Sequence, residues 1–201
     1  MPLNSNRLHK KITMPTKIIR NSYWVVPGEI LAGPFPGSDE EFSYKLRLRA
    51  LFDVGIRAFI NLQTEGEMAS SSRNYDEDYG KIFRHFLLQN NEKEIDGGFI
   101  RRFSIPDREI PSIELMINII NEIDMLRSRN IPIYIHCWGG IGRTGTVVGC
   151  WLMRHGFAER RNVIDEIFNL RKLYVETSCL VYRSPETEQQ EQFILNWKKG
   201  Q

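Results

Sequence analysis

The chain has 201 residues, 41% of them hydrophobic, which is ample for one domain with a sizeable core and short for two. Its formal net charge of +2 is small and its charges are interspersed, so the composition predicts neither a nucleic-acid partner nor an acidic-membrane partner. Three cysteines, with no apolar signal run at the N-terminus and no apolar stretch of membrane-spanning length, predict a soluble protein of a reducing compartment, the cytoplasm by default.

The beginning of the chain predicts a loose basic segment followed by the start of a sheet. Residues 1–20 carry scattered basic side chains without periodicity and predict a flexible segment, which leaves 21–201 as the folded domain. Residues 23–37 predict two short strands that meet at a Pro-Gly turn. A capped helix then begins near Ser38 and is ended by Gly55.

The next part alternates strands with polar loops. Residues 57–62 predict a buried strand, and the polar loop 63–67 at its end is placed where parallel sheets meet ligands. Residues 70–80 predict a loop or a short helix, and the apolar run 82–87 predicts another strand. Residues 104–108 predict a loop that connects a strand-like segment to a helix.

The remaining elements complete an α/β pattern. The spacing of apolar side chains predicts a helix over 113–126, a central buried strand over 132–135, and helices over 146–153, 163–173 and 193–197. No internal repeat is present. We therefore expect a single α/β domain with a central, mostly parallel mixed sheet flanked by helices, and a functional loop between the central strand and the next helix.

That loop, within residues 136–145, has the composition of an anion-binding site. Gly139, Gly140 and Gly142 let backbone N–H groups approach a ligand closely, and the following helix directs the positive end of its dipole into the loop. The backbone from Trp138 through Ile141 to Gly142 is thus expected to bind phosphate oxygens. Arg143 can hold two oxygens of a phosphoryl group with its planar fork.

Cys137 lies where the same groups favour a negatively charged sulfur. We therefore predict a nucleophilic thiolate, and Thr144 can donate its hydroxyl to that sulfur. His136 should point to the opposite face of the strand and orient the loop through a backbone hydrogen bond. A cysteine before a glycine-rich turn is also compatible with a plain strand-to-helix connection, but that interpretation does not account for Arg143 or His136.

A cysteine that attacks a phosphate monoester requires an acid to protonate the departing oxygen. Asp107, in the loop 104–108, is the preferred candidate. Asp96 and Glu109 are alternatives within reach, and Asp107 could also be a turn or helix-capping carboxylate.

At this point the chain resembles the cysteine-dependent protein tyrosine phosphatase superfamily, in its compact, dual-specificity-like branch. Residues 136–144 match the signature of His-Cys, five residues, then Arg and Ser or Thr, and Pro106-Asp107 resembles the mobile acid loop. Residues 184–193 resemble the glutamine-bearing loop that places the hydrolytic water in tyrosine-specific members. In this chain Glu186 replaces the usual first glutamine and Gln190 matches the second, so the resemblance implies Gln190 as the water-positioning residue.

The resemblance implies a metal-independent and cofactor-free hydrolysis of phosphate monoesters through a phosphocysteine, on tyrosine or on both tyrosine and serine/threonine of a phosphorylated protein. A small-molecule phosphatase for a nucleotide, inositol phosphate or lipid headgroup is the alternative within enzymes. A non-catalytic module that binds phosphorylated partners is the alternative of another class. The signature loop lacks the extra basic residues of members that act on highly phosphorylated inositols, which favours a singly phosphorylated substrate.

The other two cysteines have two interpretations. Cys150 or Cys179 could protect an oxidised Cys137 by forming a disulfide. Each is also a small apolar side chain of the kind that fills cores, and we favour that interpretation for both.

Overall fold

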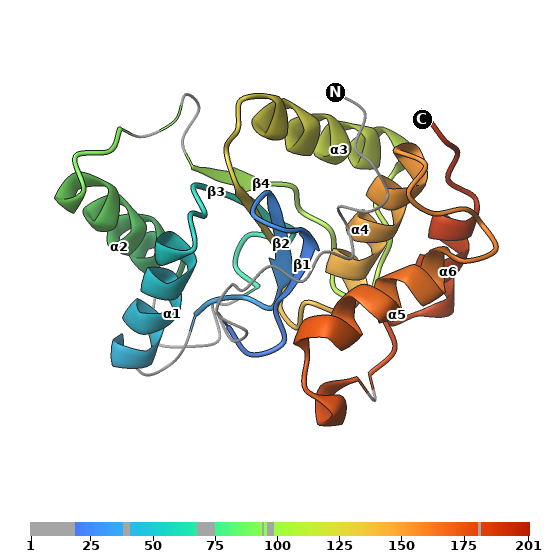
Figure 1. Ribbon diagram of the computed structural model, residues 1–201, viewed down its shortest axis with the longest axis horizontal. Helices are drawn as coiled ribbons and strands as arrows, with labels where there is room; N and C mark the ends of the chain where they lie inside the picture. The colour runs from blue at the N-terminus through green and yellow to red at the C-terminus, as the bar shows by residue number, and fades with distance from the viewer. Residues whose placement is uncertain (1–18, 38–40, 68–74, 94, 96–98, 181) are drawn as a thin grey trace.

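The computed structural model describes residues 19–37, 41–67, 75–93, 95, 99–180 and 182–201. Its centre is a five-stranded sheet with the order β1-β2-β5-β3-β4 (Figure 1). β1 is antiparallel to β2, and every other neighbouring pair is parallel. The strands are β1 (Tyr23–Val26), β2 (Ile30–Gly33), β3 (Ala58–Asn61), β4 (Ile100–Arg102) and β5 (Ile133–His136). The predicted fold class, a mostly parallel mixed sheet in one α/β domain, is confirmed.

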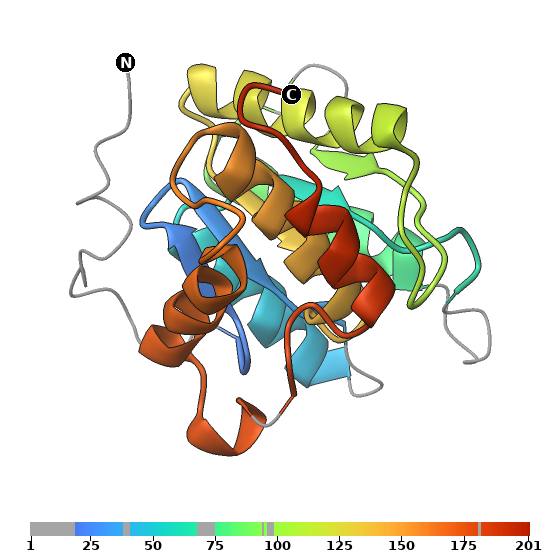
Figure 2. The same cartoon turned by 90° about the vertical axis from the view of Figure 1, so that its right-hand side faces the viewer.

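Helices cover both faces of this sheet (Figure 1). One layer holds α1 (Glu41–Asp53) and α2 (Tyr75–Gln89), and the other holds α3 (Ile113–Ser128), α4 (Gly142–Arg154), α5 (Val163–Tyr174) and α6 (Glu188–Leu195). Figure 2 shows α6 lying along α4. The buried side chains form two clusters, one under each layer. None of the described helices is both long and apolar enough to span a membrane.

The central strand β5 contributes to both clusters because successive side chains of a strand point to opposite faces. Ile133 and Ile135 belong to the cluster under α3 to α6, and Tyr134 belongs to the cluster under α1 and α2. All four residues of β5 are buried, which explains its continuous run of β-forming residues. This strand ends at His136, next to the predicted functional loop.

The prediction of a strand over 82–87 was wrong, since these residues lie in the middle of α2. Phe83 and Leu87 are buried at a spacing of four residues, whereas Arg84 between them is exposed. A short apolar run fits either period, and here packing against α1 and, through Phe83, against Phe59 of β3 favours the helix. The edge strand of this part of the sheet is β4, at the strand-like segment ahead of the loop 104–108.

Other boundaries shifted by a few residues. α4 begins at Gly142, so Arg143 and Thr144 lie in its first turn and not in the loop before it. The last helix covers Glu188–Leu195, earlier than the predicted 193–197, because Thr187 forms a capping box with Gln190. Residues 1–18 of the predicted flexible segment, and 70–74 of the predicted loop, lie outside the described residues.

Candidate active site

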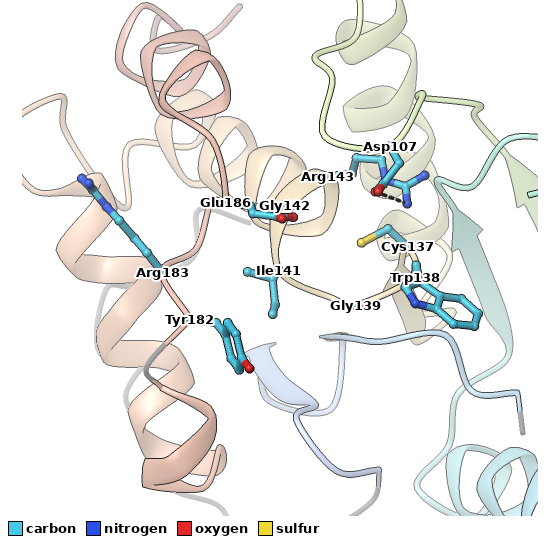
Figure 3. Close-up of a pocket in the computed structure, with 10 residues that line it drawn as sticks. All are labelled: Asp107, Cys137, Trp138, Gly139, Ile141, Gly142, Arg143, Tyr182, Arg183 and Glu186. Atoms are coloured by element: carbon cyan, nitrogen blue, oxygen red, sulfur yellow. Dashed lines mark hydrogen bonds and ion pairs between the residues drawn. The ribbon is translucent and has the colours of Figure 1, made fainter.

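The predicted loop lies at the carboxyl end of the central strand. β5 ends at His136, the chain turns through 137–141, and α4 starts at once. Together with the loop 106–109 and the segment before α6, it surrounds a pocket of about 440 Å³ (Figure 3). The residues that line this pocket are Asp107, Cys137, Trp138, Gly139, Ile141, Gly142, Arg143, Tyr182, Arg183 and Glu186.

One glycine of the loop is required by its backbone and its surroundings. Gly140 has φ of 70°, and a Cβ at that position would lie 2.3 Å from the carbonyl carbon of Gly33 at the end of β2. By contrast, a Cβ on Gly139 would find its nearest neighbour at 4.0 Å. Because Gly140 has no side chain, the loop packs tightly against β2, and the amide of Phe35 donates to the carbonyl of Trp138 at 2.9 Å.

Cys137 lines the pocket with 3% of its surface exposed. The hydroxyl of Thr144 donates to its Sγ at 3.1 Å, as expected. α4 begins five residues later, and its N-cap residue is Ile141, whose apolar side chain caps no backbone N–H group of the first turn. These N–H groups and the positive end of the helix dipole therefore remain directed at the pocket, where they favour a bound anion.

Arg143 reaches the same pocket from the first turn of α4, although its side chain is 1% exposed. Its Nη1 donates to Oε2 of Glu67 at 2.7 Å and to the carbonyl oxygen of Ile105 at 3.0 Å. Its Nη2 donates to Oε1 of Glu67 at 2.7 Å and to Oδ1 of Asp107 at 2.8 Å. Burial alone would lower the pKa of Arg143, but the hydrogen bonds to Glu67 and the negative charges of Cys137, Glu67 and Asp107 together raise it.

Glu67 is the site residue that the sequence did not reveal. It lies in the polar loop after β3, where its Oε2 also accepts from the backbone N–H and the hydroxyl of Thr64. Burial would raise the pKa of Glu67, but the hydrogen bonds from Arg143 and Thr64 lower it. The position of the polar loop at a strand end was the available signal, but nothing in its composition selected Glu67 over Glu65.

The three candidates for the acid have different surroundings. Asp107 lines the pocket with its side chain 63% exposed, and Figure 3 shows it next to Arg143. Glu109 has an exposed side chain, and only Asp107 of this loop lines the pocket. Asp96 lies outside the described residues. The structure thus brings Asp107 together with Cys137 and Arg143.

His136 faces away from the pocket, as strand alternation predicted. It is fully buried between the rings of Phe35 and Tyr134, and its Nδ1 lies 3.3 Å from the carbonyl oxygen of Cys137. Since a carbonyl only accepts, Nδ1 carries the proton. Burial lowers the pKa of His136 to about 3, so the ring is neutral and holds the loop without acid–base chemistry.

Gln190 and Glu186 both lie beside the first residue of α4, where a Cβ on Gly142 would come within 3.0 Å of Oε1 of Gln190 and of Oε2 of Glu186. Gln190 is fully buried in the first turn of α6, and its amide is bonded to protein groups on both sides. Glu186 lines the pocket and pairs with Arg108 at 3.3 Å. The segment before α6 is also fixed to the loop by Ser184, whose hydroxyl donates to the carbonyl of Ile141 at 2.8 Å.

The second described cysteine is part of the core. Cys150 lies in α4 with no exposed surface, and burial raises its pKa well above the ordinary value, which keeps the thiol protonated. The side chain of Cys179 lies outside the described residues. Within the described part of the chain, no group of three or more His, Cys, Asp and Glu side chains is arranged to hold a metal ion.

Comparison with known proteins agrees with this geometry. Residues 19–194 match the family model PTP-SAK, described as Swiss Army Knife protein, DSP-PTPase phosphatase domain. The tyrosine-protein phosphatase cdc-14 of Caenorhabditis elegans is 30% identical over 133 residues, which are 65% of this chain and 16% of that protein. The protein tyrosine phosphatase domain-containing protein 1 of Mus musculus is 26% identical over 150 residues, 75% of this chain and 19% of that protein.

Solved structures show the same fold. Kinase associated phosphatase, with its catalytic-site cysteine replaced by serine, superposes with a TM-score of 0.62 at 18% identity and covers 82% of this chain and 83% of its own. Tk-PTP in its active form has a TM-score of 0.54 at 24% identity, with 80% of this chain and 91% of that chain covered. The chain belongs to the PTP-SAK family of dual-specificity-like phosphatase domains, within the cysteine-dependent protein tyrosine phosphatase superfamily.

Proposed function

We propose that the protein hydrolyses phosphate monoesters through a phosphocysteine on Cys137, and that singly phosphorylated aryl esters such as phosphotyrosine are its preferred substrates. One observation carries the proposal. A cysteine sulfur that accepts a hydrogen bond from Thr144 shares a pocket with the fork of Arg143 and the carboxyl of Asp107. These are the nucleophile, the charge-binding group and the proton donor of such a reaction.

In the first step the thiolate of Cys137 attacks phosphorus, so that an S–P bond forms while the P–O bond to the leaving group breaks. The proton of the Asp107 carboxylic acid moves to the departing oxygen, which leaves as an alcohol or phenol. Loop amides from Trp138 to Gly142 and the guanidinium of Arg143 stabilise the equatorial oxygens.

In the second step water attacks the phosphocysteine and the S–P bond breaks. The Asp107 carboxylate accepts a proton from the water, and phosphate and the Cys137 thiolate are released. The hydroxyl of Thr144, 3.1 Å from Sγ, stabilises the charge that returns to the sulfur. Glu186, which lines the pocket, is a neighbour of the incoming water, and its pairing with Arg108 reduces its repulsion of phosphate.

The side chains at the rim of the pocket support an aryl ester with one phosphate group as the substrate. Trp138 stacks on Phe35 with its side chain 57% exposed, and Tyr182 is 65% exposed on the opposite side, where both can contact an aromatic ring (Figure 3). Arg183, which lines the pocket, is paired with Glu191, and the neighbouring Arg108 is paired with Glu186. A rim of paired charges does not favour a second or third phosphate group, which argues for a single phosphate on the substrate.

We further propose that residues 21–201 act as the catalytic domain without a cofactor, and that the protein works in the cytoplasm, where a nucleophilic thiol stays reduced.

The experiment is a comparison of wild type, Cys137→Ser and Cys150→Ser with para-nitrophenyl phosphate and a phosphotyrosine peptide, in the presence of a chelator. We expect activity in wild type and in Cys150→Ser, inhibition by vanadate, and no turnover in Cys137→Ser. A parallel panel of a phosphoserine peptide, a nucleoside monophosphate and inositol phosphates measures kcat/KM. A folded wild type without turnover would overturn the proposal, and a higher kcat/KM for a small molecule would overturn the substrate class.

A further inference from the structure

The loop that carries Asp107 is fixed to the rest of the domain on both sides of that residue. On the upstream side, the N–H of Ile105 donates to the carbonyl of Leu62 at 3.1 Å, and the Ile105 side chain is fully buried. On the downstream side, the carbonyl of Glu109 accepts from Nε2 of Gln190 at 3.1 Å. Asp107 lies two residues from each of these anchors, with its side chain 63% exposed at the pocket.

The downstream anchor is built into the cap of α6. Oε1 of Gln190 accepts from the N–H groups of Glu186 and Thr187, each at 3.2 Å, while Nε2 faces Glu109. Because Gln190 is fully buried, an unpaired Nε2 would be costly there. The amide therefore joins two loops that both border the pocket, although their residues are about eighty positions apart in the chain.

The turn between the anchors needs such support. Pro106 and Glu109 close it through an N–H to carbonyl hydrogen bond of 3.1 Å, and Arg108 has φ of 65°, which side chains with a Cβ rarely adopt. The same cap makes two further contacts with Arg108. Its guanidinium lies 3.3 Å from Glu186, and its carbonyl accepts from the hydroxyl of Thr187 at 3.5 Å.

We propose that Gln190 is a positioning residue that holds the general-acid loop over the pocket. Its amide keeps the turn in the conformation that presents Asp107 to the leaving oxygen. This inference rests on the proposed role of Asp107. It predicts that the loss of Gln190 acts on proton delivery and leaves phosphate binding intact.

The chain offers a selective variant. Gln190→Glu keeps an oxygen that accepts from the cap N–H groups, and a carboxylate in the first turn suits the helix dipole. The same change replaces the donor to Glu109 by a second acceptor, which removes the anchor. Gln189→Glu is the matched control, because it adds the same charge at an exposed neighbouring position. Thermal unfolding of both variants shows whether the fold is kept.

The readout is the dependence of kcat on the leaving group. Para-nitrophenyl phosphate releases a weakly basic oxygen that needs little protonation, whereas phenyl phosphate releases a basic oxygen of the tyrosine kind. We expect Gln190→Glu to lower kcat on phenyl phosphate about tenfold and on para-nitrophenyl phosphate less than about threefold, at unchanged KM. Asp107→Asn shows the same pattern with a larger loss, and the double variant is no slower than Asp107→Asn alone. Gln189→Glu behaves as wild type.

The outcomes separate the two proposals. If Asp107→Asn has no leaving-group dependence, Asp107 is not the acid, and both its role and that of Gln190 are overturned. Suppose instead that Asp107→Asn shows the leaving-group dependence. The positioning role of Gln190 alone is then overturned if Gln190→Glu slows both substrates equally, or if the double variant loses the full effect of both single changes. If Gln190→Glu does not fold, Arg108→Gln, which removes the ion pair between the same turn and Glu186, is measured, and an equal effect on both substrates overturns the inference.

Discussion

Glu67 and Arg143 form a bidentate ion pair, in which each Nη of the guanidinium donates to a different carboxylate oxygen at 2.7 Å. The two residues are 76 positions apart in the chain. This pair fixes the plane of the Arg143 guanidinium in the pocket. Asp107 takes the remaining position on Nη2, so a phosphate that binds there competes with the carboxyl that is proposed to act as the acid. The orientation of Arg143 is therefore set by two carboxylates from two different loops.

Glu67→Gln should weaken catalysis through this geometry. The variant leaves the buried guanidinium with only the exposed carboxylate of Asp107 as a charged partner, so that Arg143 is no longer held in one plane. We expect kcat/KM for a phosphotyrosine peptide to fall by roughly 10- to 100-fold, together with a lower melting temperature. Glu65→Gln, in the same loop but exposed, is the control for charge. Equal kinetics in the two variants would contradict the role given to Glu67.

Asp107→Asn should separate proton transfer from binding. Without the acid, kcat on phenyl phosphate falls by about 100-fold or more, the usual range for a lost general acid. Vanadate affinity rises, because a neutral amide competes less well than a carboxylate for Nη2 of Arg143. Glu109→Gln tests the alternative acid of the same loop and is expected to leave both quantities unchanged. If Glu109→Gln loses kcat instead, the acid has been misassigned.

Thr144→Val should remove the hydrogen bond that stabilises the sulfur of Cys137. The valine fills the same buried space but cannot donate to Sγ of Cys137, so the thiolate is a poorer leaving group from the phosphocysteine. We expect kcat to fall about tenfold and the burst of product from the first turnover to become visible. Thr146→Val is the control, since its buried hydroxyl donates to the carbonyl of Gly142 within α4. Comparable losses in both variants would indicate a general effect on the helix.

Gly140→Ala and Gly139→Ala should differ sharply in activity although the two positions are neighbours. A Cβ on Gly140 meets the backbone of Gly33 and Pro34 at 2.3 and 2.4 Å, and φ of 70° is itself unfavourable for alanine. The loop must then move away from β2, and activity is expected to fall at least about 100-fold. Gly139→Ala has open space and keeps most of the activity. A vanadate titration shows whether the loop of each variant still binds an oxyanion.

His136 should make stability depend on pH. Its pKa is about 3 in the folded protein and 6.5 when unperturbed, so the unfolded state binds more protons between these values. The stabilising contribution is therefore complete above pH 6.5 and is lost as the pH falls toward 3. We expect the free energy of unfolding of His136→Asn, measured with urea, to vary less with pH in this window than that of wild type. His85→Asn, at an exposed position, follows wild type.

The sequence was sufficient for the central part of the site because that part is local. The chain passes from β5 through the loop into α4 within ten residues, so glycine spacing and strand alternation place Cys137, Arg143 and Thr144 together. The orientation of His136 away from the pocket follows from the same alternation. The mostly parallel sheet was also predictable, since strands alternated with helices along the chain.

Only the tertiary structure decided the contacts between distant segments. The apolar run 82–87 fits a strand or a helix equally well, and packing in α2 made the choice. Glu67 reaches Arg143 because β3 and β5 are neighbours in the sheet, and Gln190 reaches Glu109 because α6 packs along α4. The spacing of apolar residues predicts where helices and strands form, but the hydrogen-bond partner of a polar side chain depends on which elements pack together.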